Sequence, residues 1–393
     1  MKKIPLVELQ QRIDRLQQGM AAVGMDAAVL VQNADLFYFT GTVQQGFLYV
    51  PVEGEAVFFA RKVLERVKSE SALERIVPAR SPKDVAKWIG DQELKAPTRL
   101  GMELDILPYN QYLRYQQAFG PAEIADVSAI VRSIRAVKSE YELGIIRDVA
   151  RLSNFMVQTA RGSLREGMTE IELSAAVEAA SRIAGHQGFL RNRGFGGEVY
   201  WGHLISGADA ALSTFADSPT GGRGLTRAFG QGSGYKVIKK NEPVVFDLVA
   251  GKNGYIVDQT RIMSIGPLPS KLDKAYRVAM EIMKELGAMI APGVAAMELY
   301  QKAQDIADAN GLGDHFMGYA EKAGFCGHGV GIELDELPVI VPGAKTRLAA
   351  GMVFALEPKF TFPGEGVVGV EDTFIVTASG SEKVTAADYR VEV

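Results

Sequence analysis

Two pairs of acidic residues lie in segments with the pattern of β-hairpins, and they are the first candidates for chemistry in this chain of 393 residues. Segment 244–266, VVFDLVAGKNGYIVDQTRIMSIG, has apolar residues on both sides of a turn and contains Asp247 and Asp258. If Lys252 and Asn253 form the loop, the aspartates lie directly opposite each other, with Cβ atoms about 4.5–5.5 Å apart. Carboxylates that close repel each other, so a bound cation is the simplest explanation. A slipped register, with one aspartate facing solvent, is the alternative.

A second hairpin of the same kind is predicted at 352–377, MVFALEPKFTFPGEGVVGVEDTFIVT. Glu357 and Glu371 are symmetric about Gly364, so antiparallel pairing would make them face each other. His328, in CGHGVG, is a potential nitrogen ligand, and the glycines around it allow close approach of the backbone. Each residue alone could be a solvated acid or a satisfied histidine. Together, four carboxylates and one imidazole favour two divalent ions such as Mn²⁺, Co²⁺, Fe²⁺ or Zn²⁺, bridged by carboxylates.

Composition excludes several classes of protein. Hydrophobic residues make up 47% of the chain and charged residues 23%, which is typical of a globular protein. The net charge of −4 does not favour nucleic-acid binding. The single cysteine, Cys326, excludes an intrachain disulfide and is predicted to be a buried small residue rather than a nucleophile. The amphipathic N-terminus and the lack of a long apolar run predict a cytoplasmic protein without a membrane partner.

The first part of the chain, residues 1–135, has the alternating pattern of an α/β domain. Apolar spacing predicts a helix over 6–24, ending at a glycine. A buried strand is expected at 26–31 and further strands at 55–60 and 98–104, with helices after the second strand and from Ser81.

A second domain is expected over residues 136–393. Capping boxes that begin at Ser139 and Thr169 predict two long helices. Segment 186–234 is rich in glycine and aromatic residues and is predicted to be a functional loop region. Two further helices are expected after the first aspartate hairpin, at about 270–289 and 295–310.

The order of the five candidate ligands resembles that of the pita-bread metallopeptidase family, which includes methionine aminopeptidase, aminopeptidase P, prolidase and creatinase. The matching motifs are GYIVDQTR, GHGVG, LEP and VEDTF. The first domain is similar to the creatinase-type N-terminal domain through MDAAVLVQNADLFYFTG, and the second is similar to the pita-bread catalytic domain from IRAVKSEYEL onward. The resemblance implies an α/β (α+β) fold, a dinuclear metal site, a metal-bound hydroxide and often a homodimer.

Departures from the family pattern fall on the substrate side. Prolidases and aminopeptidases P usually have a His-Glu pair after the glycine-rich motif, and Asp335 takes the place of its histidine here. They usually also have a Pro-His pair before the first metal aspartate, and Thr214 takes the place of that histidine. Gly369 replaces an arginine that prolidases often have two residues before the last glutamate. We expect Asp335 to be a candidate acid–base catalyst, and His203 and Thr214 to be candidate substrate-binding residues.

These observations predict a metal-dependent exopeptidase resembling Xaa-Pro aminopeptidase or dipeptidase. The alternative is a C–N hydrolase or lyase that acts on a small metabolite at the same site. A non-catalytic binding protein is a third interpretation, although such proteins usually lose the ligands. Because Gly369 cannot pair with a dipeptide carboxylate and an ionised Asp335 would repel it, longer Xaa-Pro peptides or a non-peptide substrate are expected to be preferred over dipeptides.

A homodimer is expected for a second reason besides the resemblance. The run Leu36-Phe-Tyr-Phe would be unfavourable to expose on a monomer.

Overall fold

The structure, a computed structural model, describes residues 2–194 and 200–393 and divides into two compact units. The first unit ends at Arg135 and also takes in Arg193, and the second begins at Ala136. None of the described helices combines the length and apolar content needed to cross a bilayer.

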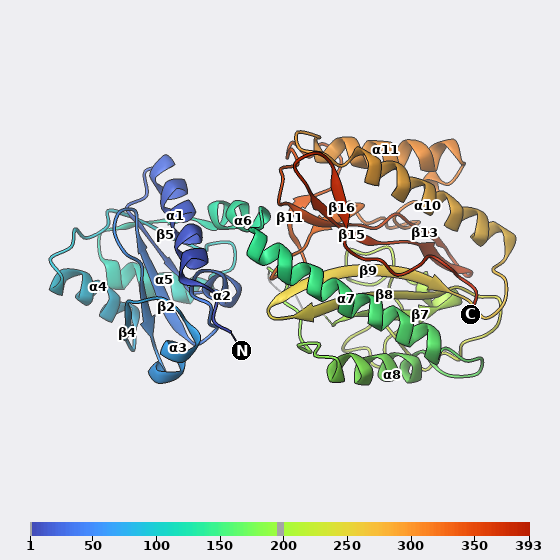
Figure 1. Cartoon of the computed structure of the whole chain (residues 1–393), viewed down its shortest axis with the longest axis horizontal. Helices are drawn as coiled ribbons and strands as arrows, with labels where there is room; N and C mark the ends of the chain where they lie inside the picture. The colour runs from blue at the N-terminus through green and yellow to red at the C-terminus, as the bar shows by residue number, and fades with distance from the viewer. Residues whose placement is uncertain (1, 195–199) are drawn as a thin grey trace. The chain divides into compact units, whose positions relative to one another are not determined.

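The first unit is built on a mixed sheet of six strands in the order β4-β3-β2-β1-β5-β6 (Figure 1). β1 pairs antiparallel with β2 and parallel with β5. The strands are β1 (Ala27–Leu30), β2 (Gly46–Pro51), β3 (Val57–Ala60), β4 (Ile76–Pro78), β5 (Arg99–Met102) and β6 (Glu123–Asp126). The helices are α1 (Leu6–Ala22), α2 (Asn33–Thr40), α3 (Leu64–Glu70), α4 (Pro82–Asp91), α5 (Tyr109–Phe119) and α6 (Ser128–Ala136). The helix predicted over 6–24 and the three predicted strands are confirmed.

The aromatic run proposed as a dimer surface is instead part of this unit's own core. It lies in α2, where Leu36 is 1% exposed and Tyr38 and Phe39 are 0% exposed. The guanidinium of Arg12, on α1, lies 4.2 Å from the centre of the Tyr38 ring. The prediction that this run is exposed on a monomer was wrong, because a short helix turns it inward. It gives no support for a homodimer.

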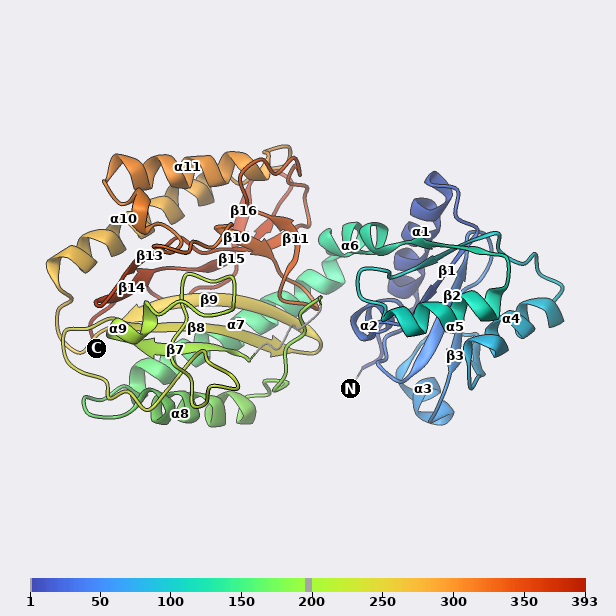
Figure 2. The same cartoon turned by 180° about the vertical axis from the view of Figure 1, so that it is seen from behind.

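The second unit contains two similar halves, each with two helices followed by a hairpin. In the first half, α7 (Glu140–Ser163) and α8 (Glu170–Ile183) precede β8 (Val244–Lys252) and β9 (Tyr255–Met263), and α7 packs against both strands. In the second half, α10 (Ser270–Met289) and α11 (Ala296–Ala309) precede β13 (Lys359–Phe362) and β14 (Gly366–Gly369), with α10 against them. Figures 1 and 2 show the strands between the two helix pairs.

Shorter elements complete this unit. They are β7 (Gly202–Ser206), α9 (Gly207–Ala210), the 3₁₀ helix η1 (Gly313–His315), β10 (Gly327–Gly329), β11 (Glu336–Val339), β12 (Val353–Leu356), β15 (Asp372–Val376) and β16 (Ser381–Lys383). β7 and α9 lie within segment 186–234, which was predicted to be mostly loop, and residues 195–199 of that segment lie outside the described residues. β7 pairs antiparallel with β8 and so extends the first hairpin to three strands.

The long helices of this unit begin where the capping boxes predicted. The Ser139 hydroxyl accepts a hydrogen bond from the Glu142 backbone N–H at 3.2 Å, and the Glu142 carboxylate accepts one from the Ser139 N–H at 3.0 Å. Thr169 and Glu172 make the same reciprocal pair at the start of α8. Each box satisfies N–H groups that a helix start otherwise leaves unpaired.

The register of the first hairpin differs from the prediction. Asp247 pairs with Thr260, and Asp258 pairs with Val249, which is two residues after Asp247. The loop is Asn253-Gly254, one residue later than expected, and both have positive φ, 54° and 87°. A two-residue hairpin loop with positive φ at both positions favours Asn-Gly. The aspartates are therefore diagonal rather than opposite, but the shift is even and keeps them on one face.

The register of the second hairpin is as predicted. Lys359 pairs with Gly369, which makes Gly364 the centre of the hairpin. Glu357 and Glu371 lie two residues beyond this pair, outside both strands, and the pairing of Leu356 with Asp372 across β12 and β15 keeps the same register. Lys359 Nζ donates to Glu357 Oε2 at 2.7 Å, so the two side chains lie on the same side of the chain.

Candidate metal centre

The structure brings together the five residues predicted to be ligands. Asp247 lies on β8, Asp258 on β9 and His328 on β10, while Glu357 directly follows β12 and Glu371 directly precedes β15. His328 Nε2 lies 3.9 Å from Asp258 Oδ2, 3.8 Å from Glu357 Oε1 and 3.8 Å from Glu371 Oε1. We call these four atoms the histidine side. Atoms of Asp258, His328 and Glu371 all lie within 4.8 Å of one another, a spacing that one metal ion can bridge.

The His328 ring is held in the tautomer that a metal ligand needs. Its Nδ1 lies 3.0 Å from the Leu334 carbonyl oxygen and 3.3 Å from that of Gly329. Carbonyl oxygens only accept, so Nδ1 carries the proton and donates. In the neutral ring Nε2 then has a free lone pair that points at the carboxylates.

Each acid on the histidine side has one oxygen held by the protein and the other directed at His328. Asp258 Oδ1 accepts from the Gln259 N–H at 2.9 Å. Glu371 Oε2 accepts from the Thr260 hydroxyl at 2.7 Å. Glu371 Oε1 is buried and has no hydrogen-bond partner among the described residues. A buried acceptor left unpaired is costly, so these residues fit a divalent cation between His328 and the acids.

A lysine that the sequence interpretation missed lies among the same acids. Lys359 Nζ donates to Asp247 Oδ2 at 2.9 Å, Glu357 Oε2 at 2.7 Å and Glu371 Oε2 at 3.0 Å. We call these four atoms the lysine side. The Lys359 side chain is 2% exposed. Glu357 and Glu371 thus give one oxygen to each side. The position of Lys359, two residues after Glu357, was the feature of the sequence that could have predicted its place among the acids.

The two sides differ electrostatically. Burial raises the pKa of Asp258 to about 7, and the charge of Asp247 adds to the effect. Burial, followed by the charge of Asp258, also raises the pKa of Glu371. Burial would lower the pKa of Lys359, but the Asp247, Glu357 and Glu371 carboxylates raise it well above its usual value. The lysine side therefore contains a permanent cation, whereas the histidine side needs a proton or a bound cation.

Asp335, the candidate acid–base catalyst, lies behind His328. Its Oδ1 is 3.6 Å from His328 Nδ1, the ring nitrogen that does not face the carboxylates, and its side chain is 49% exposed. The described contacts make it a neighbour of the histidine rather than a member of the histidine side.

Of the two candidate substrate residues, the structure brings His203 to the centre but not Thr214. His203 pairs with Asp247 across β7 and β8, and its Nδ1 is 3.0 Å from the Thr220 hydroxyl. Thr220 Oγ1 in turn donates to Asp247 Oδ2 at 3.3 Å. Thr214 Oγ1 instead accepts from the Ala216 N–H in its own loop. Thr220 lies in a segment without a regular helix or strand, and no pattern in the sequence marked it as a neighbour of Asp247.

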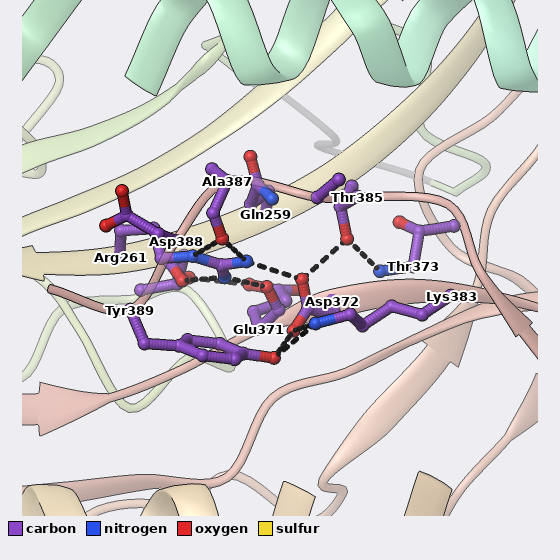
Figure 3. Close-up of polar contacts among 12 residues, drawn as sticks. Gln259, Arg261, Glu371, Asp372, Thr373, Lys383, Thr385, Ala387, Asp388 and Tyr389 are labelled. Carbon is purple, nitrogen blue, oxygen red and sulfur yellow. Dashed lines mark hydrogen bonds and ion pairs between the residues drawn. The ribbon is translucent and has the colours of Figure 1, made fainter. Parts of the chain in front are cut away.

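A buried ion pair holds the backbone next to Glu371. Figure 3 shows the Arg261 guanidinium between Asp372 and the carbonyl of Ala387, with bonds of 2.7 and 2.8 Å from Nη2. The same guanidinium donates through Nη1 to the Glu371 carbonyl oxygen at 2.8 Å. The side chains of Arg261 and Asp372 are both 0% exposed. This network fixes the start of β15, and with it the direction of the Glu371 side chain.

The glycines around His328 make room for neighbouring strands. A Cβ on Gly327 would lie 2.5 Å from the Ala355 carbonyl oxygen, and one on Gly329 would lie 2.4 Å from that of Leu337. The close approach predicted for this motif is therefore to β12 and β11. Cys326 is buried, and burial raises the pKa of its thiol, which does not favour a nucleophile.

Comparison with known proteins defines the class. The model of metallopeptidase family M24 matches residues 144–378, which is more than half of the chain, and that of the creatinase/prolidase N-terminal domain matches residues 12–137. The chain belongs to metallopeptidase family M24, and it combines a creatinase-type N-terminal domain with an M24 catalytic domain. The enzyme class predicted from the sequence, a metallopeptidase hydrolase, is confirmed.

Individual relatives cover nearly the whole chain. It is 26% identical over 382 residues to the Xaa-Pro dipeptidase of Pyrococcus furiosus, with 97% of this chain and 99% of the relative covered. The prolidase structure from Pyrococcus horikoshii has a TM-score of 0.81 at 25% identity, covering 97% of this chain and 99% of that one. The Xaa-Pro dipeptidase structure from Bacillus anthracis has a TM-score of 0.84 at 25% identity, covering 98% and 99%. These similarities favour a peptidase over the C–N hydrolase or lyase alternative.

Proposed function

We propose that this chain is a metal-dependent exopeptidase that cleaves Xaa-Pro peptides, with the five predicted ligands lining its metal centre. Mn²⁺, Co²⁺, Fe²⁺ or Zn²⁺ suits such a mixed carboxylate and imidazole set. The observation that carries the proposal is the convergence of Asp258, Glu357 and Glu371 oxygens at 3.8–3.9 Å from His328 Nε2. The full-length similarity to Xaa-Pro dipeptidases supports the substrate class.

Other residues of this chain hold the groups around this centre in fixed orientations. A divalent cation, when bound, supplies a Lewis acid and a hydroxide at neutral pH. Gln259 and Thr260 each fix one oxygen of an acid, which leaves the other oxygen facing His328. His203 and Thr220 lie beside Asp247, where the Thr220 hydroxyl donates to Asp247 Oδ2 and lies 3.0 Å from His203 Nδ1. Groups fixed in this way need little reorganisation during the reaction.

The number of ions depends on Lys359. Two ions were expected from the four carboxylates and one imidazole, and also from the family resemblance. The Lys359 ammonium already lies among three of the four carboxylates. A homodimer and a cytoplasmic location remain predictions, which rest on the resemblance and the composition.

A substrate panel tests the proposed activity. We expect protein stripped with EDTA and reloaded with Mn²⁺ to cleave Xaa-Pro dipeptides and tripeptides, and to cleave matched Xaa-Ala peptides poorly. Asp258→Asn should lower kcat/KM by about 10²-fold or more, because it removes a charged group from the centre. Asp148→Asn is the matched control, because Asp148 is an exposed aspartate on α7, and this substitution should change kcat/KM little. Turnover of small C–N metabolites without peptide cleavage would contradict the proposal.

A further inference from the structure

The β13–β14 hairpin leaves room for the Lys359 side chain and so determines its position. It lies on β13 directly opposite Gly369 on β14. A Cβ on Gly369 would lie 2.6 Å from both Cα and Cγ of Lys359, and 2.6 Å from the Pro358 carbonyl oxygen. The absence of a side chain at residue 369 therefore leaves room for the Lys359 stem to cross the hairpin. Its ammonium then reaches acids on three separate segments.

The ammonium uses the oxygens that a second ion would need. Lys359 Nζ lies 2.7–3.0 Å from Asp247 Oδ2, Glu357 Oε2 and Glu371 Oε2. A transition-metal ion would require carboxylate oxygens at about 2.0–2.2 Å. It would therefore have to lie within a few ångströms of a buried ammonium, where two cations repel strongly. The lysine side is satisfied by hydrogen bonds, whereas the histidine side retains the unpaired Glu371 Oε1.

We propose that Lys359 is the fixed cation of the lysine side and that the chain binds one divalent ion, on the histidine side. Asp258, His328, Glu357 and Glu371 hold this ion, and Asp247 pairs with Lys359 instead of a second metal. The inference rests on the proposed metal dependence, but it makes no use of the substrate.

Metal counting on the intact protein tests this directly. Protein stripped with EDTA is titrated with Mn²⁺, and bound metal per chain is measured by equilibrium dialysis with elemental analysis. The electron paramagnetic resonance spectrum of the loaded protein is recorded as well. We expect one Mn²⁺ per chain and the six-line spectrum of an isolated ion. Two ions per chain with an exchange-coupled spectrum would overturn the proposal.

A variant of the lysine tests its role as the excluding cation. Lys359→Ala removes the ammonium and opens the lysine side, so the count should rise from one to two ions per chain. Lys138→Ala is the matched control, since Lys138 is also buried and paired with a glutamate, at 3.1 Å from Glu336. The control should keep one ion. A count of one in Lys359→Ala would overturn the role of Lys359, and if that variant fails to fold, the wild-type count still decides.

The two proposals fail in different ways. Xaa-Pro cleavage by wild-type protein with two ions per chain would leave the proposed function intact and overturn the inference. One ion per chain without peptide cleavage would support the inference and overturn the proposed function. No bound ion at saturating Mn²⁺ would overturn both.

Discussion

At the scale of single residues, the proton on Asp258 links the metal centre to stability. In the metal-free protein the pKa of Asp258 is raised to about 7 from an ordinary value of 3.8. The pKa values of Glu371 and His328 are raised as well. A group whose pKa is raised on folding stabilises the protein when it is protonated, so its contribution is lost as the pH rises through the folded value.

Metal-free protein should therefore become less stable between about pH 4 and pH 8. For Asp258 alone the loss is on the order of 4 kcal/mol. Glu371 and His328 act in the same direction. We expect Asp258→Asn to flatten this dependence and to stabilise the metal-free protein at pH 8, as measured by urea unfolding in the presence of EDTA. Asp148→Asn is the control, and an equal pH dependence in both variants would contradict the role of Asp258.

The hydroxyl of Thr220 is predicted to matter for turnover, and that of Thr214 is not. Thr220→Val removes the hydrogen bonds to Asp247 and His203. Loss of a hydrogen bond of about 0.5–1.5 kcal/mol corresponds to about a 2–13-fold decrease in kcat/KM for an Xaa-Pro peptide. Thr214→Val is the matched control, because its hydroxyl bonds only within its own loop among the described contacts. Equal losses in the two variants would argue against the position assigned to Thr220.

At the scale of elements, the two hairpins show what hairpin symmetry can predict. The register about Gly364 was predicted correctly because the loop residues Pro363 and Gly364 marked the centre. The register about Asn253 was wrong by two positions because Lys252 was included in the loop and the Asn-Gly preference for positive φ was overlooked.

The lysine and the threonine of the centre were missed for different reasons. Lys359 lies two residues after Glu357, so the sequence contained enough information to find it. Thr220 contacts Asp247 from an irregular segment that lacks the two-residue alternation of a strand. Only the three-dimensional course of that segment brings the two residues together. Likewise, the burial of the aromatic run in α2 depends on packing against α1, which alternation alone does not specify.

Gly369 is predicted to be required by the hairpin itself. In Gly369→Ala the new Cβ would lie 2.6 Å from Lys359 Cα and from the Pro358 carbonyl oxygen. Overpacking of this kind typically costs about 1–3 kcal/mol, which urea unfolding would detect. Gly380→Ala is the control, since a Cβ there would have no neighbour within 4 Å. If both substitutions leave stability unchanged, the close approach of β13 and β14 is wrong.

At the scale of the whole molecule, the family and fold were predictable because the motifs around the five spaced residues resemble those of one metallopeptidase family. Oligomeric state was not predictable in the same way, since the run used to support it is buried. A homodimer remains expected from the resemblance. Light scattering at micromolar concentration should give twice the chain mass of 42.5 kDa, and a monomer mass would contradict that expectation.

The most direct test of the central claim is to locate the metal. Anomalous diffraction from crystals loaded with Mn²⁺ should show one peak, at about 2.0–2.3 Å from His328 Nε2 and the facing oxygens of the acids. Lys359 Nζ should remain bonded to Asp247, Glu357 and Glu371 in the same crystal. The absence of a peak beside His328 at saturating Mn²⁺, or a peak between Asp247 and Glu371 with the lysine displaced, would contradict the account.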